Sequence, residues 1–182
     1  YTIAKYHALW IRNSERVHEW HDPRTTDYPA SVATTWLTSF DKLGSAAQAF
    51  LRLLSWLAPD PIPSDLLDSL SEGFLVAGPL EAADPRDALG RLIEFSLANS
   101  VPGNAFILHR LVQQITRERQ PAPPDPPALV AALGWINGDF TGHSDDVRNW
   151  RVLVPLLPHA IAVASFAADR RIHDPSGRLL AL

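Results

Sequence analysis

The segment 106–119, FILHRLVQQITRER, constrains the fold more than any other part of the chain. It begins inside a run of strand-forming residues, 105–108, which follows the turn-forming pair Gly103-Asn104. Apolar side chains then recur with the i, i+3, i+4, i+7 spacing of one helical face, at Leu108, Leu111, Val112 and Ile115. Gln113 and Arg117 fall outside that face. Pro121 ends the pattern, so His109 is predicted where a short strand passes into a helix.

A histidine at such a junction has two interpretations. The first turn of a helix has backbone N–H groups without intrahelical partners, and the helix dipole is positive there. An imidazole at this position can help to bind an anion such as a phosphate. Alternatively, His109 caps the helix or is half-buried, with a purely structural role. Spacing alone favours the structural role, because single motifs have many false matches.

Composition limits the classes of protein to consider. The 182 residues are 46% hydrophobic, which suits one domain, or one domain and part of another, with a proper core. A net charge of −4 argues against a general binder of nucleic acid or of anionic membranes. Without cysteine, disulfides and thiolate metal sites are excluded. No apolar run approaches the ~20 residues of a membrane span. Because the chain starts at Tyr1 and contains no methionine, we expect a piece of a longer protein.

Most of the chain is predicted to form short helices separated by proline-rich turns. Six predicted helices span residues 1–20, 29–43, 46–57, 86–95, 128–136 and 150–168. A further short helix, capped by Ser64, is predicted between the third and fourth of these. Asp84 and Pro85 are predicted as the N-cap and the first helical residue of the helix over 86–95. Residues 96–101 and 105–108 are predicted as a hairpin, and the segment 120–127, QPAPPDPP, as a linker.

The periodicity also predicts which side chains are buried. A shared core is predicted from Trp36, Phe40, Phe50, Leu53 and Leu111. Inward-facing side chains are predicted in three further helices. They are Ile3, Tyr6 and Val17 in the helix over 1–20, Leu89, Leu92 and Ile93 in the helix over 86–95, and Val154, Leu157, Ile161 and Ala164 in the helix over 150–168. Pro155 and Pro158 predict that the last helix starts near Pro158 or is kinked.

Several helices, a two-stranded wing and another helix form the order of a winged helix, so the predicted fold class is mainly α. Three segments resemble, in family order, the winged-helix region of NB-ARC signalling NTPases. Residues 35–43, TWLTSFDKL, resemble its "SYDxL" helix, and residues 50–63 look like the next helix and its "FPED-I" turn. Residues 108–112, LHRLV, are similar to the "MHDLV" motif, and residues 150–182 look like the entry to a tetratricopeptide array. The predicted domains are 1–27, the closing helix of a preceding domain; 28–121, the winged helix; and 122–182, a linker and the start of the repeats.

The resemblance implies that His109 contacts the β-phosphate of ADP and holds the full-length parent in its closed, inactive state. Arg110 stands where plant members have Asp, and we expect it to support this contact. No cofactor is expected in this chain, whereas ADP or ATP with Mg is expected in the parent. The expected partners are the NTPase domain and C-terminal repeats of the same protein, other proteins, and further copies of the activated parent. No nucleic acid or membrane partner is expected, and the predicted location is the cytoplasm.

No catalytic residue is predicted. The phosphate-binding pattern GxxxxGK[ST] does not occur, and neither Lys5 nor Lys42 follows a glycine-rich loop. His18, His21 and Asp22 suggest a metal site, but no further ligand completes it, so no metal is predicted. The predicted function is regulatory, coupling the nucleotide state of an NTPase domain to a sensor array.

Two alternatives remain open. The first is a DNA-binding winged helix, although the charges of Arg86 and Arg91 are offset by Asp87 and Glu94. The second is a plain helical scaffold for protein interactions. The scaffold is favoured if His109 is buried and all its polar atoms are bonded within the protein.

Overall fold

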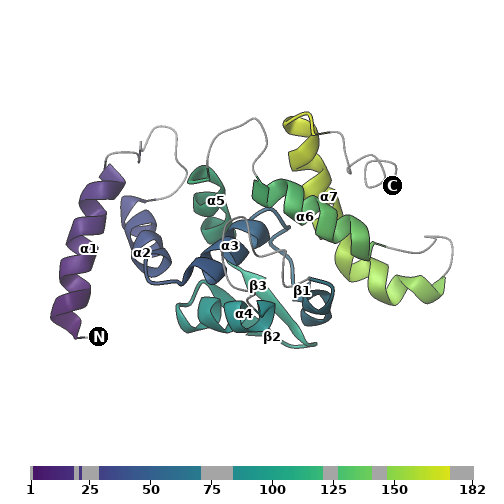
Figure 1. Ribbon diagram of the computed structural model, residues 1–182, viewed down its shortest axis with the longest axis horizontal. Helices are drawn as coiled ribbons and strands as arrows, with labels where there is room; N and C mark the ends of the chain where they lie inside the picture. The colour runs from purple at the N-terminus through teal and green to yellow at the C-terminus, as the bar shows by residue number, and fades with distance from the viewer. Residues whose placement is uncertain are drawn as a thin grey trace. The chain divides into compact units, whose positions relative to one another are not determined.

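The computed structural model describes residues 2–18, 21, 29–70, 84–120, 127–140 and 147–172. The chain divides into two compact units, Tyr1–Gly44 and Ser45–Leu182 (Figure 1). The predicted domain boundaries near residues 27 and 121 stay predictions.

The first unit is a pair of helices held by a polar network. Helix α1 (Ile3–His18) packs on α2 (Ala30–Phe40). Fully buried Asn13 donates from Nδ2 to Thr38 Oγ1 (3.2 Å) and accepts from Arg16 Nη1 (3.1 Å). The same guanidinium pairs with Asp41 at 2.5 Å. Because each buried polar atom of Asn13 is satisfied, the network specifies the register of the two helices.

The predicted inward stripe of α1 is only partly correct. Val17 is buried, but Ile3 is 89% exposed and Tyr6 is also exposed. Helix α2 is shorter than α1. Thr38 of α2 contacts Asn13, whereas the ring of Tyr6 is met by Lys42, which follows α2 (Nζ 4.6 Å from the ring centroid). Periodicity predicts an apolar face, but it does not predict how far the neighbouring helix extends along it.

Helix α3 (Ser45–Leu54) is the centre of the second unit. It packs against α4 (Pro85–Glu94), α5 (Arg110–Glu118) and α6 (Pro127–Asp139). Its fully buried side chains and those just after it are among the largest in the core: Phe50, Leu51, Leu54, Trp56 and Leu57. Phe50 and Leu53 are buried as predicted, whereas Leu111 is only half-buried.

A three-stranded antiparallel sheet lies beside these helices, in the order β1 (Ile62–Pro63), β3 (Ala105–Leu108), β2 (Ala98–Val101). Strands β2 and β3 form the predicted hairpin, whose turn needs positive φ at Gly103 (88°) and Asn104 (54°). Strand β1 is missing from the sequence prediction. It is two residues long and ends in proline, which an edge strand tolerates because no ladder N–H is lost.

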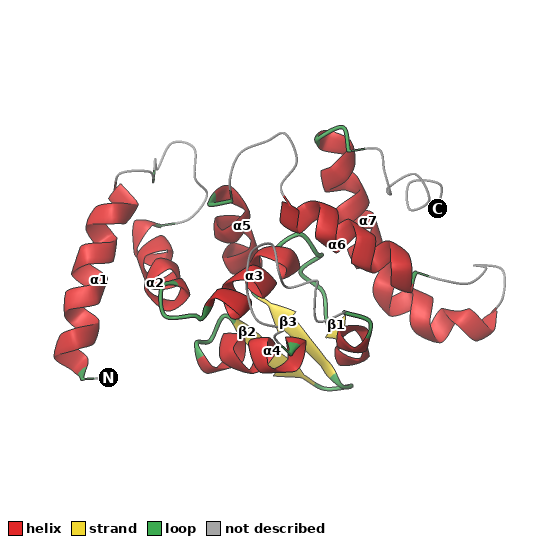
Figure 2. Ribbon diagram, in the orientation of Figure 1, coloured by secondary structure: helices red, strands yellow, loops and turns green. Residues whose placement is uncertain are grey.

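From α3 to α5, the elements follow one another as α3, β1, the 3₁₀ helix η1 (Ser64–Asp68), α4, β2, β3 and α5 (Figure 2). The predicted mainly α fold is confirmed. Asp84 caps α4, accepting from the N–H of Arg86 (2.8 Å), with Pro85 in the first turn as predicted. Ser64 is not a cap: Pro63 holds that position without a side-chain bond. Within α4, Leu92 is buried, but Ile93 faces solvent.

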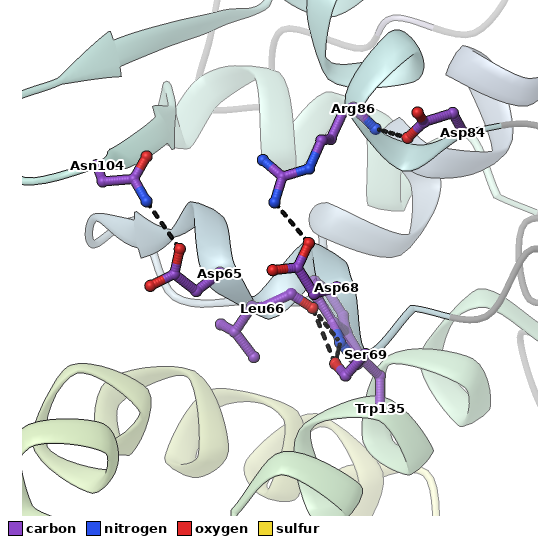
Figure 3. Close-up of polar contacts among 8 residues, drawn as sticks. All are labelled: Asp65, Leu66, Asp68, Ser69, Asp84, Arg86, Asn104 and Trp135. Carbon is purple, nitrogen blue, oxygen red and sulfur yellow. Dashed lines mark hydrogen bonds and ion pairs between the residues drawn. The ribbon is translucent and has the colours of Figure 1, made fainter.

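The short helix η1 connects three other elements (Figure 3). Side chains from the hairpin turn, from α4 and from α6 all reach it. From the hairpin turn, Asn104 Nδ2 donates to Asp65 Oδ1 (2.8 Å), and from α4, Arg86 Nη2 donates to Asp68 Oδ1 (2.5 Å). From α6, Trp135 Nε1 donates to the carbonyl of Leu66 (3.1 Å) and to Ser69 Oγ (3.0 Å). The tip of the hairpin is therefore attached to the body of the unit.

Helix α7 (Trp150–Asp169) follows the 3₁₀ turn η3 (Val147–Asn149) and packs along α6 and against β1. It starts at Trp150 and includes both prolines. Of the four side chains predicted inward, Ala164 is buried, but Val154, Leu157 and Ile161 are exposed, so the predicted face is wrong for three of them. The buried side chains are Leu153, Leu156, His159, Ala160, Val163, Ala164 and Ala167. This helix is apolar on two sides, so periodicity alone does not identify the side that packs.

Among the described helices, α7 alone is long and apolar enough to cross a membrane by length and composition. Core helices of soluble proteins meet the same criterion, and the inner side of α7 packs on α6 and β1.

His159 connects α7 to the chain just before β1. Its side chain is fully buried, and Nε2 lies 3.2 Å from the carbonyl oxygen of Pro61. Because a carbonyl only accepts, Nε2 carries the proton. Nδ1 is buried without a hydrogen-bond partner in the described ranges. Burial lowers the pKa of this imidazole, so the folded chain holds it neutral.

Acidification is expected to destabilise the fold at His159. The unfolded imidazole has a pKa of about 6.5, and the folded one titrates lower. As the pH falls below about 6.5, the unfolded chain takes up a proton that the folded chain resists, so the free energy of unfolding falls. His159→Gln should flatten this slope, measured by urea unfolding between pH 7.5 and 5.5. The exposed His7→Gln variant is the control, and an unchanged slope in His159→Gln would contradict the assignment.

Candidate functional site

His109 lies where the sequence predicts it, between the last residue of β3 and the first residue of α5. It is the N-cap of α5, with extended backbone (φ −65°, ψ 132°), and its side chain is exposed. The ring atom Nδ1 accepts a hydrogen bond from the N–H of Leu111 (3.2 Å). The carbonyl of His109 accepts from the N–H of Gln113 (3.1 Å). The side chain of His109 therefore satisfies one of the N–H groups that lack an intrahelical partner, and its carbonyl accepts the first i→i−4 bond of α5.

The cap decides which ring nitrogen carries the proton. A nitrogen that accepts a hydrogen bond is unprotonated, so the neutral ring has its hydrogen on Nε2. Nε2 has no hydrogen-bond partner among the described residues. The exposed edge of His109 thus presents one N–H donor beside the positive end of a helix. His109 is therefore neither buried nor fully bonded within the protein, whereas the scaffold alternative expects it to be both.

The charges around this position suit an anion. Arg110, the first residue of α5, is exposed, and the first turn of α5 contains no acidic side chain. Nucleophilic catalysis would need a second titratable group bonded to the imidazole, and the described residues contribute none. The arrangement supports binding of an anion and gives no support to catalysis.

The polar side of α5 is attached to the C-terminal end of α3. Gln113 is 2% exposed, and its Nε2 lies within hydrogen-bond distance of the carbonyls of Leu54 (3.3 Å), Leu57 (3.2 Å) and Ala58 (3.4 Å). Leu54 is the last residue of α3, and Leu57 and Ala58 follow it. Carbonyls at a helix end lack i+4 donors, and of these three only Leu54 also accepts a backbone N–H from a described residue, that of Leu57 (3.2 Å). The prediction that Gln113 lies outside the packed face is wrong, and Leu111 and Val112 are only half-buried.

Two further polar side chains complete this contact. Arg117 donates to the carbonyl of Ser55, and burial lowers the pKa of its guanidinium to about 10. Gln120 donates to the carbonyl of Arg52 (3.1 Å) and accepts from Trp56 Nε1 (3.1 Å). Sequence reasoning missed all three polar residues. Their i, i+4, i+7 spacing at 113, 117 and 120 is a signal that could have revealed a shared face.

This attachment has a consequence for His109. Helix α5 is short, and it is bonded to the end of α3 through Gln113 and Arg117, on successive turns, and through Gln120, two residues past its last residue. The strand β3 holds the near end through its pairs with β1 and β2. The imidazole is therefore carried on a segment that is fixed on both sides, as a precise contact requires.

The other candidate groups give no second site. The two cations of α4 are paired internally, Arg86 with Asp68 (2.5 Å) and Arg91 with Glu94 (2.7 Å). Within the described ranges, no group of three or more His, Asp or Glu could hold a metal ion. The His18 side chain and Asp22 lie outside what the structure describes. A pocket of about 350 Å³ between η1 and α6 does not include His109.

Comparison with known proteins covers the same region. Residues 38–122 match a family described as a domain of unknown function (DUF7779). No curated protein and no solved structure matches the chain. The matched span runs from α2 to just beyond α5, and so includes α3, the three strands, α4 and the helix α5 that His109 caps.

Proposed function

We propose that this chain is a non-catalytic, regulatory part of an NB-ARC signalling NTPase. Its winged helix would comprise α3, β1, η1, α4, the β2–β3 hairpin and α5, and α6 and α7 would begin the helical repeats. The order of these elements supports the winged helix, and the junction at His109 supports the resemblance of residues 108–112 to the family motif. The parent would act in the cytoplasm and bind ADP or ATP with Mg.

One observation carries this proposal: the Nε2–H of His109 is an exposed donor at a helix N-terminus. A phosphate oxygen is the acceptor that such a donor and dipole favour. A hydrogen bond to a charged group contributes roughly 1.5–3 kcal/mol. If the contact forms only in the closed state, it favours that state by about ten- to a hundredfold. Arg110, adjacent and exposed, supplies a second positive group.

Two substitutions of His109 separate its contact with nucleotide from its cap. In the full-length parent, both His109→Ala and His109→Asn should release ADP about ten- to a hundredfold faster, because neither presents the Nε2–H donor. Asparagine still accepts from the N–H of Leu111, so only the alanine variant should lose the cap, which stabilises by roughly 0.5–2 kcal/mol. Nucleotide release and thermal unfolding are measured on each variant.

The matched control is Arg119→Gln, just past the far end of α5, which should release ADP at the parent rate. If His109→Asn also releases ADP at the parent rate, the imidazole is only a cap and the nucleotide contact is rejected.

The isolated chain should neither hydrolyse ATP nor bind ATP or ADP appreciably. One imidazole at a helix end does not replace a loop whose backbone N–H groups surround the phosphates. Titration calorimetry of the 182-residue chain with Mg-ATP and with ADP tests this. Micromolar affinity for either nucleotide would show a complete binding site in this chain and would overturn the assignment of its role.

The charges on α4 argue against the DNA-binding alternative. In a winged helix, the helix before the hairpin is the usual recognition element, and here that helix is α4. Both of its cations, Arg86 and Arg91, are paired with carboxylates of the same unit. Asp87 adds a negative charge to its first turn. Such a surface has little attraction for phosphate backbones.

A further inference from the structure

The outward side of α7 is an apolar ridge. Trp150, Val154, Leu157 and Ile161 are 52%, 60%, 41% and 61% exposed, and their spacing of i, i+4, i+7, i+11 places them on one line along the helix. The inner side of α7 is buried against α6 and β1. A contiguous exposed ridge of large apolar side chains is typical of an interaction surface.

The ridge changes in size along the helix. Its large side chains lie in the N-terminal half of α7. Ser165 and Ala168, both exposed, continue the line in the C-terminal half. Two such ridges fit each other best when the helices run in opposite directions, because large side chains of one copy then lie on small side chains of the other.

The charges at the two ends of α7 fit the same arrangement. Arg151 and Asp169 are both exposed. They are five turns apart, which is about 27 Å in an ideal helix, so helical periodicity places them on the same side although Pro155 and Pro158 lie between them. They are too far apart to pair within one copy. Neither has an ion-pair partner among the described residues. In an antiparallel pair, each arginine faces the aspartate of the other copy.

We propose that two copies of this chain associate through α7, with the helices antiparallel and related by a two-fold axis near His159. Leu157 packs against Ile161 of the second copy beside the axis, and Trp150 packs against Ala168 of the second copy. Arg151 pairs with Asp169 of the second copy at each end. The contact is short, so we expect a dimer in exchange with monomer. This interface does not depend on the nucleotide contact. It uses the exposed side of α7 that a following helical repeat would cover, so it replaces the assignment of α6 and α7 to the start of a repeat array.

The ridge is tested by sedimentation velocity and light scattering on the 182-residue chain over a range of concentrations. Leu157→Glu places two carboxylates at the axis and should abolish the dimer. The side chain is substantially exposed, so the melting temperature should stay unchanged. Val130→Glu, at an exposed apolar position of α6, is the matched control and should dimerise normally. A chain that is monomeric at every concentration, or a dimer insensitive to Leu157→Glu, overturns the proposal.

Reversing the end charges tests the antiparallel arrangement. Arg151→Glu and Asp169→Arg, made singly, should each raise the dissociation constant about three- to thirtyfold, because two pairs per dimer are lost. The double reversal should restore the parent value. It also places an acidic residue at the start of α7 and a basic one at its end, which the helix dipole favours, so folding is not impaired. Absence of rescue overturns the antiparallel register.

Discussion

Replacing Phe50 with alanine is expected to lower the free energy of unfolding by about 3–5 kcal/mol. Phe50 is fully buried in α3, the helix on which α4, α5 and α6 all pack. Removing its ring leaves a cavity that the surrounding helices cannot close without losing other contacts. Chemical denaturation followed by circular dichroism measures the change.

The matched control is Ile93→Ala, because Ile93 is an exposed side chain on α4. It should change the free energy of unfolding by less than about 1 kcal/mol. If Phe50→Ala also falls below that limit, α3 is not the centre of the core and the assignment of the helix faces fails with it.

Sequence signals that act between near neighbours predict this structure well. Gly103 and Asn104 mark a turn that needs positive φ, and the hairpin forms around them. Asp84 and Pro85 mark the start of α4 because capping and proline geometry are properties of a single helical turn. The position of His109 is also predictable from its near neighbours, since the strand pattern ends and the helix pattern begins at that residue.

Features that depend on distant partners are not predictable in this way. Strand β1 exists because Ile62 pairs with Phe106, far along the chain, and its flanking prolines resemble an ordinary turn. In α7 both sides are apolar, and only the position of α6 decides which is buried. The tautomer of His109 follows from its bond to Leu111, which requires the backbone geometry of the cap.

The predicted shared core also fails where it depends on which distant elements pack together. Phe50 and Leu53 are buried in the second unit, while Trp36 is buried in the first and Phe40 is half-buried there. Leu111 was expected inward because α5 was interpreted as an apolar helix on an apolar core. Its inward side instead meets the polar end of α3, so Gln113 takes the buried position.

Gln113→Glu is expected to destabilise the second unit by about 2–4 kcal/mol at pH 7. The two amide hydrogens of Gln113 are shared among three carbonyl oxygens within hydrogen-bond distance, and a carboxylate would instead place negative charge among them. Keeping the new carboxyl protonated at pH 7, against an unfolded pKa of about 4.3, costs about 1.4 kcal/mol for each pH unit. Urea unfolding at several pH values measures the effect.

The pH dependence identifies the cause. The carboxyl has a folded pKa above its unfolded value, so its penalty is absent below about pH 4.3 and grows as the pH rises toward the folded pKa. The variant should therefore gain stability relative to the parent on acidification, whereas His159 makes the parent lose stability on acidification. Gln113→Leu, which loses the donor without adding a charge, should cost roughly 1–3 kcal/mol at every pH. If the glutamate variant differs from the parent by the same amount at pH 7 and pH 4.5, the side chain does not face the end of α3, and the fixed attachment of α5 that positions His109 is wrong.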